Sequence, residues 1–221
     1  MAKEPKPGRV KTRLCPPCTP EQAAELAAAA LADTLDAALG SGADEVVVAL
    51  DGAVGAWCPP GVRVIPQVDG PFDGRLAAAC EHAGGPAVQI GMDTPQVTSL
   101  LLDDAMSRLV SPRIDSVLGR AVDGGWWLIG LHAPDRRVFV DVPMSCDDTG
   151  DLQLARLASL GHTVGHLATL IDVDHIDDAI AVAAEAPTTR FAVTLAAMDL
   201  AAPSPRAGVR RADLTAAGVA R

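Results

Sequence analysis

The sequence predicts one α/β domain in three layers, with a mixed, mostly parallel sheet that is covered by helices on both faces. Two observations lead to this prediction. Helical and strand-like segments alternate along the 221 residues. The strand-like segments are continuous apolar runs, which is typical of strands that are buried on both faces. A hydrophobic content of 49% is enough to fill such a core.

The clearest local signal is a helix over residues 19–39. Thr19 and Gln22 fit a capping box around Pro20, and Gly40 ends an Ala- and Leu-rich run. The other elements of the first half are apolar runs between Gly, Pro and Asp turns. They are strands at 45–50, 62–66 and 86–91, a loop at 67–74, and helices at 75–83 and 98–110.

The same alternation continues in the second half. It predicts strands at 115–119, 126–131 and 164–170, a helix at 152–160, a helix that follows residue 178 and runs to about 186, and room for another at 191–200. Beyond Pro203 the composition turns to Pro, Ser, Ala and Arg without periodicity. We expect residues 1–200 to form one domain and residues 201–221 to be a disordered tail.

The charged residues are unevenly chosen. Asp outnumbers Glu by 22 to 6, Arg outnumbers Lys by 15 to 3, and all three lysines lie in the first eleven residues. A net charge of −10 repels phosphate backbones and anionic lipid, so we expect neither a nucleic-acid nor a membrane partner. We find no apolar targeting segment or membrane span, and therefore expect a soluble cytoplasmic protein.

Aspartates follow several of the predicted strands. Ligands of open α/β sheets bind at the carboxyl ends of the strands, where the sequence places Asp51, Asp93, Asp123, Asp172 and Asp174. Short carboxylates that converge there suit Mg²⁺ or Mn²⁺, which takes oxygen ligands and keeps coordination positions for phosphates. Aspartate also caps helices and forms turns, and that alternative stays open at this point.

A basic segment near the N-terminus supplies the opposite charge. Arg9, Lys11 and Arg13 alternate, so in an extended stretch they would point the same way, and Gly8 lets the backbone approach a ligand closely. Such a loop can neutralise a diphosphate and stabilise charge on a leaving phosphate. A frayed basic tail is the alternative.

Four segments, taken together, resemble one protein family. They are AKEPKPGRVKTRL, MDTP after a strand, VDGGWWLIGL and IDVDHIDD. The resemblance is to the bacterial nucleotide-diphospho-sugar transferase superfamily, with its Rossmann-like glycosyltransferase-A-type fold, and in particular to the small glycosyltransferase-like branch associated with arsenosugar biosynthesis. It covers residues 2–186. KTRL and the aspartate pattern are similar, more distantly, to the molybdenum-cofactor and phospholactate guanylyltransferases.

The resemblance implies three groups of site residues. The nucleotide would be bound by Lys3, Gly8, Arg9, Lys11, Arg13, Gln67, Gly74 and Arg75. Asp93 would bind Mg²⁺ or Mn²⁺, with Asp172 or Asp174 as a second ligand. The acceptor side would be formed by Asp123, Gly124, Gly125 and Trp127, and the catalytic residues would be Lys11, Arg13 and Asp123.

The chain also departs from the family pattern. An apolar strand precedes the AKxP segment in the family, whereas this chain opens at Met1, so we expect the first strand to be missing. A Tyr-Tyr pair is replaced by Trp126 and Trp127, of which one should pack in the core and one should face the cleft. Met144 stands where a Trp is common.

Three functional hypotheses follow. The first is a metal-dependent transferase that moves a glycosyl group from a nucleotide sugar to a small acceptor. The second is a nucleotidyltransferase that condenses a nucleoside triphosphate with a phosphorylated metabolite, which the three clustered cations favour. The third is a truncated or degenerate nucleotide-binding protein. A homodimer is compatible with all three.

Overall fold

The computed structural model describes residues 1–200. Its strands are β1 (Ala2–Lys3), β2 (Val47–Asp51), β3 (Arg63–Pro66), β4 (Ala87–Ile90), β5 (Ser116–Arg120), β6 (Trp126–Leu131) and β7 (Val164–His166). Its helices are α1 (Pro20–Leu39), α2 (Phe72–Ala83), α3 (Ser99–Leu109), α4 (Thr149–Ser159), α5 (Ile176–Glu185) and α6 (Arg190–Ala197). Two short 3-10 helices, η1 (Thr12–Leu14) and η2 (Arg136–Val138), complete these elements.

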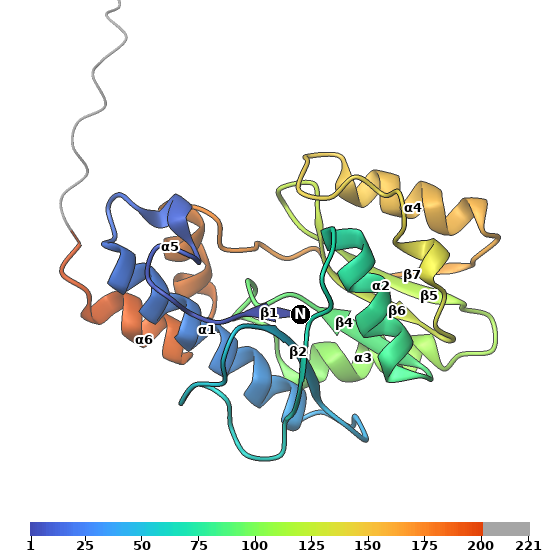
Figure 1. Cartoon of the computed structure of the whole chain (residues 1–221), viewed down its shortest axis with the longest axis horizontal. Coiled ribbons are helices and arrows are strands. Elements are labelled where there is room, and N and C mark those ends of the chain that lie inside the picture. Colours follow the sequence, from blue (N-terminus) through green and yellow to red (C-terminus); the bar gives the residue numbers. More distant parts are fainter. Residues whose placement is uncertain (201–221) are drawn as a thin grey trace, which may run out of the picture.

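The strands form two hydrogen-bonded sheets. The first has the order β1-β2-β3 and is parallel throughout. The second has the order β4-β6-β5-β7, in which β6 runs antiparallel to both of its neighbours while β5 and β7 are parallel. Figure 1 shows the short β1 and the N-terminus between β2 and β4. The predicted mixed α/β fold is confirmed, and only two residues of strand precede the basic segment.

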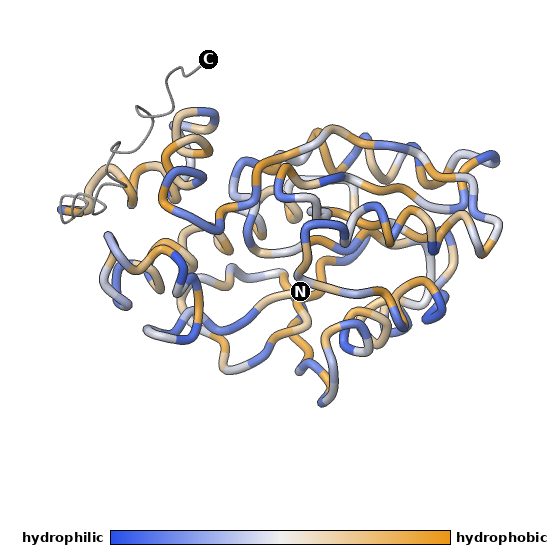
Figure 2. The backbone as a smooth tube through the Cα atoms, turned by 90° about the horizontal axis from the view of Figure 1, so that it is seen from above, coloured by the Kyte–Doolittle hydropathy of each residue, from blue (hydrophilic) through white to orange (hydrophobic). Residues whose placement is uncertain are grey.

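Helices cover both faces of the second sheet. Leu128 of β6 packs in a cluster with α3, whereas Ile129 and Leu131 pack in a cluster with α2 and α4. This opposite placement follows from the alternation of side chains along a strand. The outer turns are mainly hydrophilic (Figure 2). A further cluster joins α5 and α6 to α1, and it includes the fully buried Leu14 of η1.

The predicted capping box of α1 is present. Thr19 Oγ1 accepts a hydrogen bond of 3.2 Å from the Gln22 N–H, and Gln22 Oε1 accepts one of 2.8 Å from the Thr19 N–H. Other boundaries differ from the prediction by a few residues. Helices α2 and α4 each begin three residues early, at Phe72 and Thr149.

Strand β7 is shorter than the predicted 164–170. It ends at His166, and beyond it only Leu170 forms a bridge, to Ala121. The predicted tail, 201–221, lies outside the described residues. No helix within residues 1–200 is both long enough and apolar enough to cross a membrane.

Candidate functional site

A cavity of about 810 Å³ lies where the parallel strands end. It is lined by the basic segment after β1, the turn after β4, the turn between β5 and β6, the segment before α4, the segment between β7 and α5, and one side of α2. Loops at the carboxyl ends of strands are the usual ligand-binding position in this type of sheet. The cavity is therefore our candidate active site.

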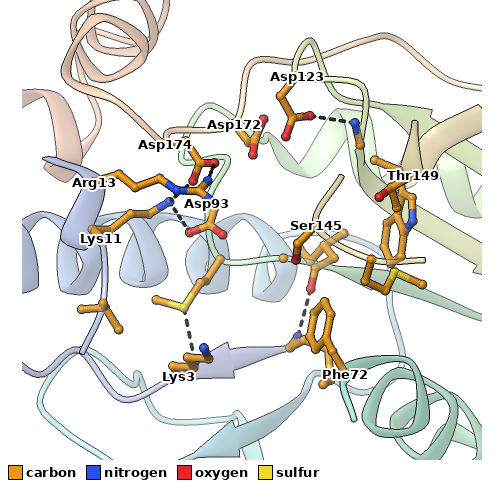
Figure 3. A pocket seen from close by; sticks show the side chains of 18 of the residues that line it. Lys3, Lys11, Arg13, Phe72, Asp93, Asp123, Ser145, Thr149, Asp172 and Asp174 are labelled. Atoms are coloured by element: carbon orange, nitrogen blue, oxygen red, sulfur yellow. Dashed lines mark hydrogen bonds and ion pairs between the residues drawn. The ribbon is translucent and has the colours of Figure 1, made fainter. Parts of the chain in front are cut away.

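Three aspartate carboxylates converge on one side of the cavity. One carboxylate oxygen each from Asp123, Asp172 and Asp174 lies within 4.8 Å of the other two. Figure 3 shows the three side chains directed toward one another. Asp123 Oδ1 also accepts a hydrogen bond of 2.8 Å from the Gly125 N–H, which orients its carboxylate. We call these three residues the acidic triad.

Crowding of like charges affects Asp172 most. Burial, followed by the nearby Asp123 and Asp174 carboxylates, raises the pKa of Asp172 from 3.8 to about 6, while Lys11 opposes the shift. A divalent cation would relieve this repulsion, and carboxylate oxygens are the ligands that Mg²⁺ and Mn²⁺ prefer. The donor set of the acidic triad therefore fits such a cation. The structure groups Asp123, rather than the predicted Asp93, with Asp172 and Asp174.

Lys11 is a nearly buried cation in the wall of the cavity. Its side chain is 8% exposed, and Nζ lies 2.6 Å from Asp93 Oδ1 and 3.9 Å from Asp174 Oδ1. Lys11 Nζ also donates a hydrogen bond to the carbonyl of Val173. The residue has a φ of 49°, in the left-handed region that is uncommon outside glycine. The Lys11 ammonium thus joins the turn after β4 to the segment after β7.

The other basic residues of this segment are more accessible. The Arg13 side chain is 61% exposed, and its Nη1 donates a hydrogen bond to Asp174. Arg9 and Lys3 also line the cavity. The buried Leu14 holds the segment against α1, so these cations face the same space as the acidic triad.

Gln67 and Arg75 form a connected wall. Gln67 Nε2 donates hydrogen bonds to the carbonyls of Ala2, at 2.8 Å, and Ala49, at 3.0 Å. Arg75 Nη1 donates to Gln67 Oε1 at 2.8 Å, and the Arg75 guanidinium lies 5.2 Å from the centroid of the Phe72 ring. Gln67 therefore ties β1 to β2 as well as lining the cavity.

Of the two glycines after Asp123, one allows a close contact between backbone segments and the other lines the cavity. Gly124 has a φ of +92°, and an added Cβ would lie 1.8 Å from the carbonyl oxygen of Asp147. Glycine is required there because two backbone segments touch. Gly125 lines the cavity itself.

The Trp pair divides between core and cavity. Trp127 is 2% exposed, packs in the cluster with α3, and donates a hydrogen bond of 2.9 Å from Nε1 to the Ala168 carbonyl. Trp126 lines the cavity and packs in the cluster with α2 and α4. Successive strand residues face opposite sides, so only one ring can reach the cavity. The predicted Trp127 therefore belongs to the core, and Trp126 is the member of the pair that lines the cavity.

Most of the predicted residues meet at this cavity. Those that line it are Lys3, Arg9, Lys11, Arg13, Gln67, Arg75, Asp93, Asp123, Gly125, Asp172 and Asp174. Those that do not line it are Gly8, Gly74, Gly124 and Trp127. Sequence reasoning missed Phe72 and Leu76, which form an apolar side of the cavity together with Trp126 and Met144. It also missed Thr149 at the start of α4, where the acidic loop before the helix was the available signal.

A family model described as "Uncharacterized protein conserved in bacteria (DUF2064)" matches residues 21–146, more than half of the chain. This chain belongs to that family. No curated protein matches this member of the DUF2064 family.

Solved structures share its fold. A crystal structure from Desulfovibrio desulfuricans G20, whose assignment as a nucleotide-diphospho-sugar transferase is provisional, matches with a TM-score of 0.80 and 23% identity, over 88% of this chain and 90% of that one. CMP:2-keto-3-deoxy-manno-octonic acid synthetase complexed with CTP matches with a TM-score of 0.51 and 13% identity, over 72% of this chain and 87% of that one. The fold is thus the glycosyltransferase-A type. At these identities the likeness shows the fold alone.

Proposed function

We propose that this protein is a divalent-metal-dependent transferase that moves a glycosyl group from a nucleotide-activated sugar to a small acceptor. The observation that supports this most is that the acidic triad and the basic segment line the same cavity at the carboxyl ends of the strands. The resemblance of the sequence to the arsenosugar-associated branch favours a small acceptor.

Each part of the cavity has a role in this proposal. Asp123, Asp172 and Asp174 would hold Mg²⁺ or Mn²⁺, which supplies positive charge to the diphosphate when bound. Arg9 and Arg13 would bind phosphate oxygens, because a guanidinium matches a phosphate with paired hydrogen bonds. During transfer, the bond from the anomeric carbon to the diphosphate oxygen breaks, and the acceptor oxygen forms the new bond to that carbon. The nucleoside diphosphate leaves carrying the electron pair, and the proton of the acceptor hydroxyl is released to solvent.

The apolar side of the cavity is where we place the acceptor. Phe72, Trp126 and Met144 line the cavity together and offer ring and thioether surface. Such surface excludes water from a reacting sugar, which limits hydrolysis of the donor. Trp126 takes the acceptor contact that the sequence had assigned to Trp127.

A nucleotidyltransferase is the second candidate. Five cationic side chains, Lys3, Arg9, Lys11, Arg13 and Arg75, line the cavity, and this number suits the greater charge of a triphosphate. In that reaction a phosphorylated metabolite attacks the α-phosphorus of the nucleoside triphosphate and pyrophosphate leaves. A cytoplasmic location and a homodimer stay predictions under either candidate.

Product analysis separates the candidates. The full chain is incubated with Mn²⁺ or Mg²⁺, with UDP-, GDP- and ADP-sugars or with nucleoside triphosphates, and with mixed small acceptors. Metal-dependent release of a nucleoside diphosphate supports glycosyl transfer, whereas pyrophosphate release overturns it in favour of the second candidate. If none of these nucleotides changes the melting temperature with or without metal, both candidates fail.

Matched variants test the site assignment. Asp172→Asn and Lys11→Met should weaken nucleotide binding at least tenfold. Lys6→Met is the control, because Lys6 pairs with Glu4 at 2.9 Å, is half exposed and does not line the cavity. Binding by Asp172→Asn and Lys11→Met that equals that of Lys6→Met would show that the nucleotide binds elsewhere.

A further inference from the structure

The Arg75 guanidinium, in the first turn of α2, is a cation of the cavity wall without an ionic partner. Its Nη1 donates a hydrogen bond to Gln67 Oε1, a neutral acceptor, and its Cζ lies 5.2 Å from the centroid of the Phe72 ring. No carboxylate in the described part of the chain lies within 4 Å of it. Lys11 and Arg13, by contrast, each pair with an aspartate of the cavity. The described residues therefore leave the positive charge of Arg75 without a counter-charge.

The unused part of the Arg75 guanidinium is an edge that suits an oxyanion. Nη1 donates to Gln67, and neither Nε nor Nη2 has a hydrogen-bond partner within residues 1–200. Nε is buried, and an N–H group that is buried without an acceptor costs free energy. Two neighbouring N–H groups of an arginine match two oxygens of a carboxylate or a phosphate. A ligand with such a group would satisfy this edge and supply the missing negative charge.

A second donor without a partner lies on the apolar side of the cavity. Trp126 Nε1 is buried and has no hydrogen-bond partner among the described residues. The Trp126 ring packs in the same cluster as Leu76, the residue after Arg75, and all three residues line the cavity. An indole N–H and a guanidinium N–H only donate, whereas the oxygens of an ionised carboxylate only accept. This pair of donors therefore favours an anionic ligand.

Arg75 and the acidic triad lie on opposite sides of the cavity. Phe72, the ring beside the Arg75 guanidinium, is at the bottom of Figure 3, whereas Asp123 and Asp172 are at the top. An anionic group is attracted by Arg75 and repelled by the carboxylates of the triad. A bound molecule with one anionic end would therefore direct its other end toward the acidic triad.

We propose that Arg75 determines the specificity for the acceptor by binding an anionic group on it, a carboxylate or a phosphate, through the Nε and Nη2 edge. Trp126 donates a hydrogen bond to an oxygen of the same acceptor. The attacking hydroxyl lies at the other end of the acceptor, toward the acidic triad and the donor sugar. The proposal rests on the proposed function, because the ligand on the apolar side is taken to be the acceptor. It differs from the nucleotide-binding role that the sequence resemblance implies for Arg75.

Matched probes test the anion site without any transfer reaction. Glucose, glucuronate and glucose 6-phosphate share one ring and differ at carbon 6, and glycerol, glycerate and glycerol 3-phosphate repeat the comparison on a smaller molecule. In calorimetric titrations of the metal-free full chain, at least one anionic probe should bind about tenfold or more tightly than its neutral parent. A preference for the acid or for the phosphate identifies the group. If no anionic probe binds more tightly than its parent, the proposal is overturned.

Arginine variants show where the anionic probe binds. Arg75→Met should weaken binding of the preferred anionic probe about ten- to a hundredfold, without weakening binding of its neutral parent. Arg75→Lys keeps the charge but loses the paired N–H groups, so it should restore only part of the affinity. Arg13→Met is the matched control in the same cavity and should keep the affinity within about threefold of wild type. A loss in Arg13→Met without a loss in Arg75→Met would overturn the proposal.

Failure of this proposal and failure of the proposed function give different results. Binding of an anionic probe that depends on Arg75 supports the anion site even where no nucleoside diphosphate is released. Where transfer is observed, Arg75→Met should raise the KM for the acceptor and leave the KM for the nucleotide sugar nearly unchanged. A raised KM for the nucleotide sugar with an unchanged KM for the acceptor would assign Arg75 to the nucleotide and overturn the proposal.

Discussion

Replacing Asp172 by Asn should make the metal-free protein more stable. In the wild type, burial and the like charges of Asp123 and Asp174 raise the pKa of Asp172 from 3.8 to about 6. At neutral pH the folded protein must therefore hold a carboxylate that resists ionisation, whereas the unfolded chain ionises it freely. Asn has the same shape without the charge, so it removes this cost.

The magnitude follows from the two pKa values. A rise from 3.8 to about 6 corresponds to about 3 kcal/mol at 1.36 kcal/mol per pKa unit. Asp172 is only partly buried, and solvent screening reduces the expected gain to about 1–2 kcal/mol. For a chain of this size, the gain amounts to a rise in melting temperature of about 2–8 °C. It should be present at pH 7 and vanish near pH 4, where the wild-type carboxyl is protonated in the folded state.

The assay is urea unfolding at pH 4 and pH 7, with and without MnCl₂. Manganese should stabilise the wild type by about 2.7 kcal/mol at a concentration one hundred times its dissociation constant, and it should leave Asp172→Asn nearly unchanged. Asp69→Asn, at an exposed position that does not line the cavity, controls for loss of negative charge. If Asp172→Asn is destabilised at pH 7, or still gains stability from manganese, the electrostatic account of the acidic triad is wrong.

Three further outcomes are expected. In metal-free protein with Met1 retained, as mass spectrometry verifies, the free energy of unfolding should rise from pH 6 to 8. Burial lowers the pKa of the Met1 ammonium from 8.0 to about 6, so the folded state binds fewer protons than the unfolded state in that window. A flat urea-unfolding profile between these pH values would contradict burial of the ammonium. Gly124→Ala should cost at least about 3 kcal/mol in urea unfolding, whereas Gly85→Ala, whose added Cβ meets nothing within 4 Å, should stay within about 1 kcal/mol of wild type. Trp127→Phe should lower stability through its lost core contacts and hydrogen bond, and Trp126→Phe should mainly raise the KM for the acceptor; the reverse pattern in unfolding and steady-state kinetics would overturn the corrected assignment.

Much of the fold follows from local sequence. The capping box of Thr19 and Gln22, the closing Gly40 and the apolar runs of β2, β4 and β6 mark their elements within a few residues. The antiparallel direction of β6 leaves no local signal, because a continuous apolar run is equally suited to either direction. The pairing of strands is decided by the whole sheet.

The sequence predicted which residues line the cavity better than it predicted which of them lie next to one another. A strand-end position identified Asp93, Asp123, Asp172 and Asp174 as one group, and all four line the cavity. Which three converge depends on how far each loop extends beyond its strand, and sequence spacing does not contain that distance. Trp126 and Trp127 are a second example. Alternation along a strand predicts that the two rings lie on opposite faces of the sheet, but it does not predict which face borders the cavity.

The distribution of charge now has a structural explanation. Lys11 is nearly buried because Asp93 and Asp174 both lie within 4 Å of its ammonium, while Asp172 and Asp123 have no lysine within that range among the described residues. The basic segment thus neutralises one part of the aspartate cluster and leaves the acidic triad with an excess of negative charge. A divalent cation bound to the acidic triad would neutralise this excess. Its positive charge would then face the phosphates of a nucleotide together with Arg9 and Arg13. An excess of Asp over Glu suits this arrangement, because the shorter side chain loses less rotamer entropy when its carboxylate is held close to another.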